Sequence, residues 1–250
     1  MAQEPSSEMF DHFYSLSSRG AYGELIRYIR DHDDEDVRYG AAGVLSESVS
    51  GFAEQMTPPA RKALVDAVLN DPSDAVRANV VKTLLAIDES IADNIITRLE
   101  MAPDSTPTDT PYPLILTKWH ERQWPELRFL AVVGFGRVGS HTTIEKLRTT
   151  IQRETDLRVI RRAIEASGTV GDETFVTPIK NYLRIDDESM YQSADAEEIR
   201  RTKQAAVEAL VKLGTNGAYE ALHTASRGTD AELKACALSE IGRLEPDEAV

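Results

Sequence analysis

The sequence predicts an all-α protein, an α-solenoid of about six consecutive helix pairs. A phrase of apolar and small residues recurs six times, and a second helical segment stands ahead of each copy. No convincing alternating strand pattern accompanies the copies, since the only short strand candidate is Pro113–Leu116. Repetition of one helical unit therefore decides the fold class.

The repeated phrase marks the second helix of each pair, which we call the signature helix. The copies start at Val37, Val76, Leu127, Val159, Thr202 and Leu233, so successive starts are 39, 51, 32, 43 and 31 residues apart. Apolar or small residues fall at offsets 0, 4, 7, 8 and 11 from the starts, except for Glu240 at offset 7 of the last copy. This spacing places them on one stripe of a helix with 3.6 residues per turn.

The first helix of each pair, which we call the lead helix, is expected at residues 21–32, 58–70, 88–101, 140–153, 172–184 and 215–226. Side chains that accept hydrogen bonds from a first helical turn are expected to cap several starts, namely Asp36, Thr57 and Ser73. Glycines that favour a left-handed residue after a helix follow three signature helices, at Gly139, Gly171 and Gly214. The helix boundaries are thus marked independently of the apolar stripe.

The signature resembles that of the HEAT-repeat family, and in particular its short phycocyanobilin-lyase-type repeats. Asp36-Val37-Arg38 with Ala41-Ala42, and the run Gly168–Asp172, carry the resemblance most directly. The family implies an armadillo-like α–α superhelix whose signature helices line the concave face, where a partner is expected to bind together with the edge formed by the turns between helices. It also implies that the arginine following the first signature residue links adjacent repeats, which applies here to Arg38, Arg77 and Arg128.

The expected organisation has three parts. Residues 1–20 form an N-terminal capping helix, residues 21–244 the solenoid, and residues 245–250 an acidic tail. Insertions at 102–123 and 185–198 interrupt the third and fifth pairs between lead and signature helix. Because such turns lie along one edge of a solenoid, both insertions are expected on that edge, where repeat proteins often bind partners.

Composition narrows the class of function. The 250 residues include 42 Asp and Glu against 28 Lys and Arg, a net charge of −14, with 20 Arg among the basic residues. This acidity disfavours general binding to nucleic acid or anionic membranes. It is typical of proteins from salt-accumulating halophiles, and we expect a halophilic archaeal source. Because the chain has no long apolar run, no membrane segment is expected. Because it has a single cysteine, a cytoplasmic location is expected.

The middle of the chain departs from this acidic background. Both tryptophans, Trp119 and Trp124, lie in or beside the first insertion, and the next signature helix is apolar all round, with Phe129 outside the usual stripe. Residues 119–162 contain nine Lys and Arg against five Asp and Glu. We expect a protein partner, with acidic surface favoured, at Trp119, Trp124, Arg128, Phe129, Arg161 and Arg162. The alternative is structural: the insertion folds back over the helix, and arginines pair with carboxylates such as Asp156.

Residues for catalysis are sparse. Five scattered histidines form no H-E-x-x-H pattern, Cys236 is expected to pack inside the last helix, and we expect neither a metal nor a cofactor. Deoxyhypusine hydroxylases resemble this architecture but hold iron through several His–Glu pairs, whereas this chain has one, His120-Glu121. A non-enzymatic interaction scaffold or adaptor is therefore expected, with an enzymatic activity left open. A nucleic-acid-binding or DNA-repair protein using the central Arg and Trp residues is the alternative, and the sequence does not indicate the oligomeric state.

Overall fold

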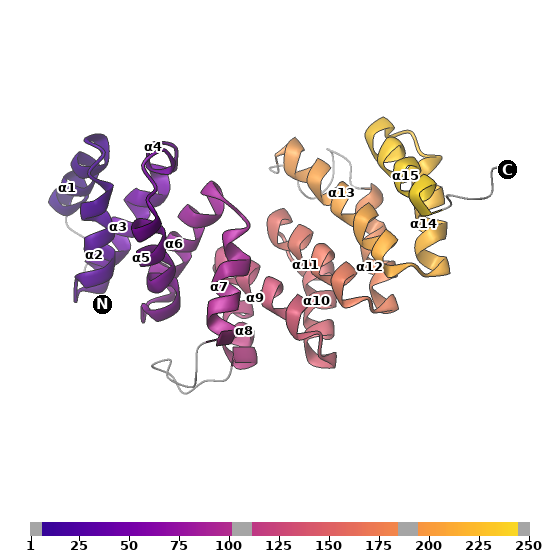
Figure 1. The fold of residues 1–250 in the computed structure, drawn as a ribbon, viewed down its shortest axis with the longest axis horizontal. Helices are drawn as coiled ribbons and strands as arrows, with labels where there is room; N and C mark the ends of the chain where they lie inside the picture. Colours follow the sequence, from indigo (N-terminus) through magenta and orange to yellow (C-terminus); the bar gives the residue numbers. More distant parts are fainter. Residues whose placement is uncertain (1–6, 102–111, 185–194, 245–250) are drawn as a thin grey trace. The chain divides into compact units, whose positions relative to one another are not determined.

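The computed structural model describes residues 7–101, 112–184 and 195–244, and every regular element in these ranges is a helix (Figure 1). The chain is thus an all-α α-solenoid, as predicted. It divides into two compact units, Met1–Leu130 and Ala131–Val250.

The first unit consists of two layers of helices. One layer contains α1, α3 and α6 in succession, and the other contains α2, α5 and α7. The first layer, which we call the signature layer, consists of the capping helix α1 (Ser7–Ser18) followed by the signature helices α3 (Glu35–Glu47) and α6 (Asp74–Ile87). The other layer, which we call the lead layer, consists of α2 (Tyr22–Asp31), α5 (Pro58–Asn70) and α7 (Ile91–Met101). The short α4 (Val49–Ala53), α8 (Tyr112–His120) and the start of α9 (Pro125–Val138) complete this unit.

The second unit repeats the two-layer arrangement. Its signature layer is α11 (Leu157–Val170), α13 (Ala196–Leu213) and α15 (Ala231–Leu244), which contact one another in succession. Its lead layer is α10 (His141–Arg153), α12 (Val176–Lys180) and α14 (Asn216–Ser226). Two 3₁₀ segments, η1 (Glu173–Phe175) and η2 (Asn181–Arg184), flank α12.

The predicted apolar stripe is the side of each signature helix that forms the core. At offsets 4 and 8, Ala41 and Leu45 of α3 are 0 % exposed, as are Ala163 and Ser167 of α11. Ser167 is accommodated there because its hydroxyl donates to the carbonyl of Ala163 at 2.7 Å. Packing between layers and between repeats therefore uses the register read from the sequence.

Glycine at offset 9 allows neighbouring signature helices in the second unit to approach closely. A Cβ on Gly168 of α11 would lie 2.9 Å from the Cα of Ala209 on α13. A Cβ on Gly136 of α9 would lie 2.8 Å from the Cβ of Ala166 on α11. In both pairs the facing alanine stands at offset 7, so glycine against alanine is a repeated interface rule.

A buried ion pair joins two repeats of the first unit. The Nε of Arg38 on α3 donates to Asp71, at the C-terminal end of α5, at 2.9 Å, with side chains 9 % and 4 % exposed. The Nη1 of Arg38 also donates to the carbonyls of His32 and Asp33. Because both charges are held by several hydrogen bonds, removal of one would leave the other buried and uncompensated. For Arg38 the expected link between repeats is therefore present.

Two of the three predicted N-terminal caps and all three predicted C-terminal glycines are confirmed. Thr57 and Ser73 cap α5 and α6, accepting from the amides of Ala60 and Val76. Gly139, Gly171 and Gly214 have φ of 57°, 78° and 61°, which is the left-handed conformation expected after a helix. The prediction for Asp36 was wrong: Asp34 caps α3 and accepts from the amide of Asp36, which lies in the first turn.

Three further local predictions differ from the structure. The expected lead helix at 172–184 is divided into η1, α12 and η2. Pro178 has no amide hydrogen and its ring crowds the preceding turn, which accounts for the interruption ahead of α12. The strand candidate Pro113–Leu116 lies within helix α8. The second insertion was expected to extend to residue 198, but Asp195 already caps α13, which starts at Ala196. Residues 102–111 and 185–194 of the two insertions, and the tail 245–250, lie outside the described residues.

Candidate functional site

The aromatic residues predicted to bind a partner are largely inside the first unit. Trp119 on α8 and Phe129 on α9 are each 3 % exposed, and Leu116 on α8 is 0 % exposed. The described part of the first insertion therefore contributes to the core. Trp119 and Phe129 cannot serve as surface anchors in this arrangement, which favours the structural interpretation for them. Trp124, in the turn before α9, is half-buried and keeps an accessible surface.

Arg128 on α9 takes a structural position that repeats the one of Arg38. Its Nη1 donates to the carbonyls of Arg122 and Gln123 at 3.0 and 2.8 Å. Arg38 makes the same contacts to the residues six and five positions before it. The guanidinium thus stabilises the turn before its own helix by hydrogen bonds to two backbone carbonyls.

Arg161 and Arg162 are brought together by a shared carboxylate on α11. Arg161, 6 % exposed, donates to Glu198 of α13 at 2.6 Å and to Glu165 at 3.0 Å. Arg162 donates to the other oxygen of Glu165 at 2.8 Å and keeps 26 % of its side chain exposed. Arg161 therefore helps to join α11 to α13, and Arg162 is the more accessible of the two.

The predicted residues consequently form two groups. Trp119, Trp124, Arg128 and Phe129 belong to the first unit, and Arg161 and Arg162 to the second. Of all six, Trp124, Arg128 and Arg162 retain partly accessible side chains. The candidate surface of the second unit is the exposed side of its signature layer.

A row of charged residues on α13 extends that surface, and the sequence analysis did not single it out. Glu197 accepts from Arg200 at 2.7 Å and from Arg201 at 2.9 Å. Hydrogen bonds from Arg200 and then Arg201 lower the pKa of Glu197 to about 2. The signal was present in the spacing of Glu and Arg at three and four residues, which places both arginines beside the carboxylate on one helix face.

The same surface is hollowed between α13 and α15. A cavity of about 350 Å³ is lined by residues of both charges, among them Arg200, Lys203, Asp230 and Glu232. Lys203 donates to Asp230 at 2.7 Å across this hollow, and the pKa of Asp230 is held below its usual range mainly by that bond. Lys203 and Asp230 also line an adjoining cavity of about 780 Å³. The hollow is lined by apolar as well as charged side chains, and Lys203 and Asp230 pair across it, as at the rim of a protein interface.

Metal-ligating side chains do not gather in the described part of the chain. Within residues 7–101, 112–184 and 195–244, no cluster of three or more His, Cys, Asp or Glu could hold a metal ion. Cys236 of α15 is half-buried, and burial followed by the charges of Glu240 and Glu208 raises its pKa. A thiol held protonated in this way is a poor nucleophile. None of the described helices combines the length and apolar character needed to cross a membrane.

Comparison with known proteins gives one informative relative. The HEAT repeat-containing taxis protein OE_2401F of Halobacterium salinarum is 28 % identical over 158 residues, or 63 % of this chain. The match supports a HEAT-repeat family. A halophilic origin is suggested by the source of that HEAT-repeat relative, whereas the phycocyanobilin-lyase type of repeat is not confirmed. The chain matches 37 % of the length of this curated relative.

Other comparisons add little. No family model matches the chain. Among solved structures, human deoxyhypusine hydroxylase in complex with glycerol is similar with a TM-score of 0.44 and 13 % identity, covering 94 % of this chain and 99 % of that one. A likeness this weak establishes neither a shared fold nor a shared chemistry.

Proposed function

We propose that the chain is a non-enzymatic protein-interaction scaffold that acts as an adaptor in a taxis system. The observation that carries the proposal is the match over 158 residues to a HEAT repeat-containing taxis protein. Stacked helix pairs suit this role because neighbouring helices present one continuous row of side chains to a partner.

The surface proposed for the partner is the exposed side of α11 and α13 in the second unit. Arg162 and Arg158 have side chains 26 % and 43 % exposed, and both lie beside carboxylates of their own helix or cap. An acidic partner segment can compete for these guanidinium groups at the cost of exposed ion pairs worth about 0–1 kcal/mol each. Such exchange favours reversible binding, which suits an adaptor.

Nucleic-acid binding receives less support from the same arginines. Arg158 pairs with Asp156 at 3.0 Å, and Arg161 and Arg162 pair with Glu165 and Glu198. Phosphates would have to approach these carboxylates, and high salt weakens phosphate contacts steeply. A protein partner fits this surface better.

A genetic experiment tests the proposed role directly. Deletion of the gene from its source organism is expected to abolish directed migration towards an attractant in semi-solid medium while growth and undirected motility stay normal. A wild-type copy should restore migration. Normal directed migration in the deletion strain would overturn the assignment to taxis.

Interaction variants then test the surface. Arg162→Glu and Trp124→Ala are compared with Lys212→Glu, an exposed charge in the last turn of α13. Affinity purification at native salt, followed by mass spectrometry, is expected to lose taxis proteins with Arg162→Glu and to keep them with Lys212→Glu. Loss with Trp124→Ala alone would move the interface to the first unit, and retention in both test variants would remove these surfaces from consideration.

A further inference from the structure

The outer face of the last described helix, α15, is built like an interface between repeats. Offset 5 of the signature phrase is completely buried in the five preceding signature helices. The residues there are Ala42, Val81, Val132, Ile164 and Val207, each 0 % exposed. In α15 the same position is Leu238, which is 50 % exposed.

Glycine at offset 9 gives a second, independent sign. Gly136 and Gly168 take up this position on α9 and α11, and each receives an alanine of the next signature helix. Gly242 occupies it on α15, and a Cβ placed there would meet nothing within 4 Å. The close-approach glycine is therefore present on α15 without the helix that it accommodates elsewhere.

These residues form one continuous stripe. α15 packs on α13 and α14 through Leu233, Ala237 and Ile241. Its opposite side carries Ala231, Ala235, Leu238 and Gly242, all exposed. A half-exposed leucine among small residues, in the register that is buried in the preceding signature helices, marks a place where a helix docks.

We propose that this stripe, Ala231–Ala235–Leu238–Gly242, docks against the same stripe of a second copy of the chain, with the two α15 helices antiparallel. A two-fold axis near Leu238 places Leu238 against its own counterpart and Ala235 against Gly242 of the other copy. These contacts again set alanine against glycine, here between antiparallel helices and with the alanine at offset 2 instead of offset 7. The proposal goes beyond the scaffold function and does not depend on it.

Charge complementarity supports this occupant. Glu232 and Arg243 are eleven residues apart and lie on one flank of the stripe, both exposed. An antiparallel two-fold keeps each flank on its own side, so Glu232 of one copy faces Arg243 of the other with an offset of about 1.5 Å along the axis. Arg243 contacts Glu240 of its own helix at 2.7 Å and keeps 73 % of its side chain exposed, so a second carboxylate can reach it.

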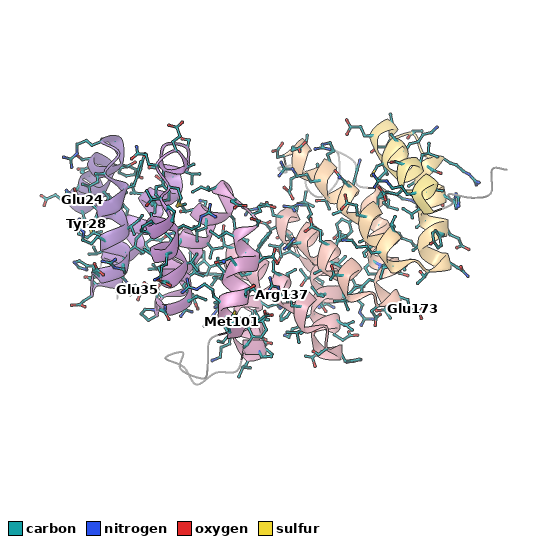
Figure 2. All side chains as sticks on the ribbon, in the orientation of Figure 1. Glu24, Tyr28, Glu35, Met101, Arg137 and Glu173 are labelled. Carbon is teal, nitrogen blue, oxygen red and sulfur yellow. The ribbon has the colours of Figure 1, made fainter. Side chains whose placement is uncertain are left out.

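A head-to-tail arrangement fits less well. It would place the stripe of one copy against the first helices of another. The exposed side of α1 carries Glu8, Asp11, His12 and Ser15. On α2, Glu24 projects into solvent (Figure 2), as does Arg27. Tyr14 of α1 is 47 % exposed but donates to Glu47, so charged groups border its ring and make this surface a poorer match for Leu238.

The oligomeric state in solution tests the proposal. Sedimentation velocity of the full chain is expected to show a dimer, and Leu238→Asp should weaken it by about tenfold or more, since central apolar contacts dominate interface energies. The control is Glu8→Arg, which changes an exposed acidic residue in a first helical turn elsewhere. A wild-type chain that stays monomeric at the highest attainable concentration would overturn the proposal.

A charge swap tests the antiparallel arrangement. Glu232→Arg and Arg243→Glu should each weaken the dimer at low salt, and the double variant should regain the wild-type dissociation constant. The single-variant losses should shrink in high salt, where the screening length is about 3 Å at 1 M. A double variant no better than either single one would refute the pairing of Glu232 with Arg243.

Site-directed cross-linking gives an independent measurement. In a Cys236→Ser background, Leu238→Cys lies on the axis and is expected to form an intermolecular disulfide on mild oxidation. Ala231→Cys, on the same stripe, would lie about 21 Å along the axis from its counterpart and should not. Equal cross-linking at both positions would indicate random collision and count against the interface.

Discussion

Replacement of Gly168 by alanine tests the glycine-on-alanine rule between repeats. The added Cβ would meet the Cα of Ala209 at 2.9 Å and its Cβ at 3.1 Å. Because a backbone atom cannot rotate away, α11 and α13 must separate by several tenths of an ångström. Overpacking of this kind costs about 1–3 kcal/mol, while alanine gains about 1 kcal/mol of helix propensity over glycine. With the contact falling on backbone, we expect a net loss of about 1–2 kcal/mol in the free energy of unfolding.

Gly43→Ala is the matched control. Gly43 also lies inside a signature helix, but the nearest atom to its added Cβ would be the Nδ2 of Asn79 at 3.8 Å, an ordinary contact. This variant should keep the propensity gain, so the two should differ by about 2–3 kcal/mol. Urea unfolding at fixed salt, monitored by circular dichroism, measures both midpoints. If Gly168→Ala proves as stable as Gly43→Ala, the interface is looser than described and the packing argument fails.

Three further predictions address the core, an ion pair and a cap. Trp119→Ala should lower the free energy of unfolding by about 3–5 kcal/mol, as expected for a buried aromatic residue, and a variant with wild-type urea stability would mean that Trp119 is not buried. Asp71→Ala should lower the free energy of unfolding by about 3–5 kcal/mol because it leaves Arg38 buried without its carboxylate. The same urea unfolding measurement, made on Asp71→Ala and on Asp71→Asn, checks this loss. Asp156→Ala should cost about 1 kcal/mol at pH 7 through loss of a helix cap. Burial raises the pKa of Asp156, but its bonds to Arg158 and to two backbone amides outweigh this and lower it. The wild-type advantage is therefore complete above the unfolded pKa of about 3.9 and disappears as the pH falls through the folded pKa; a difference unchanged at low pH would contradict this.

Most of the fold follows from the sequence because one stripe repeats. Six copies in register predict the signature helices, and the start of α5 was predicted from Thr57 and its prolines. Pro178 is a sequence signal against one continuous helix at 172–184, but the prediction of that lead helix rested on the repeat spacing and did not use it. The choice between Asp34 and Asp36 as cap depends on backbone angles, which composition does not specify: Asp34 has ψ of 124° and caps.

The candidate site was less predictable because exposure depends on tertiary packing. The two tryptophans in and beside the first insertion look alike in sequence, but α8 places Trp119 inside the first unit, whereas Trp124 in the following turn is half-buried. Arg161 and Arg162 are neighbours in the chain, yet the first is sealed by Glu198 from another repeat. Local charge identified the region. Only the fold distinguishes the residues that stabilise the structure from those that face solvent.

The unequal length of the signature helices has a consequence for engineering. α13 contains 18 residues and α11 contains 14, and the extra length of α13 lies ahead of the repeated phrase. The contact with Gly168 is made at Ala209, in the later part of α13. Extra turns can therefore be added at the start of a signature helix without altering its register against its neighbours. The N-terminal end of these helices is accordingly a natural place to graft a new binding segment onto this scaffold.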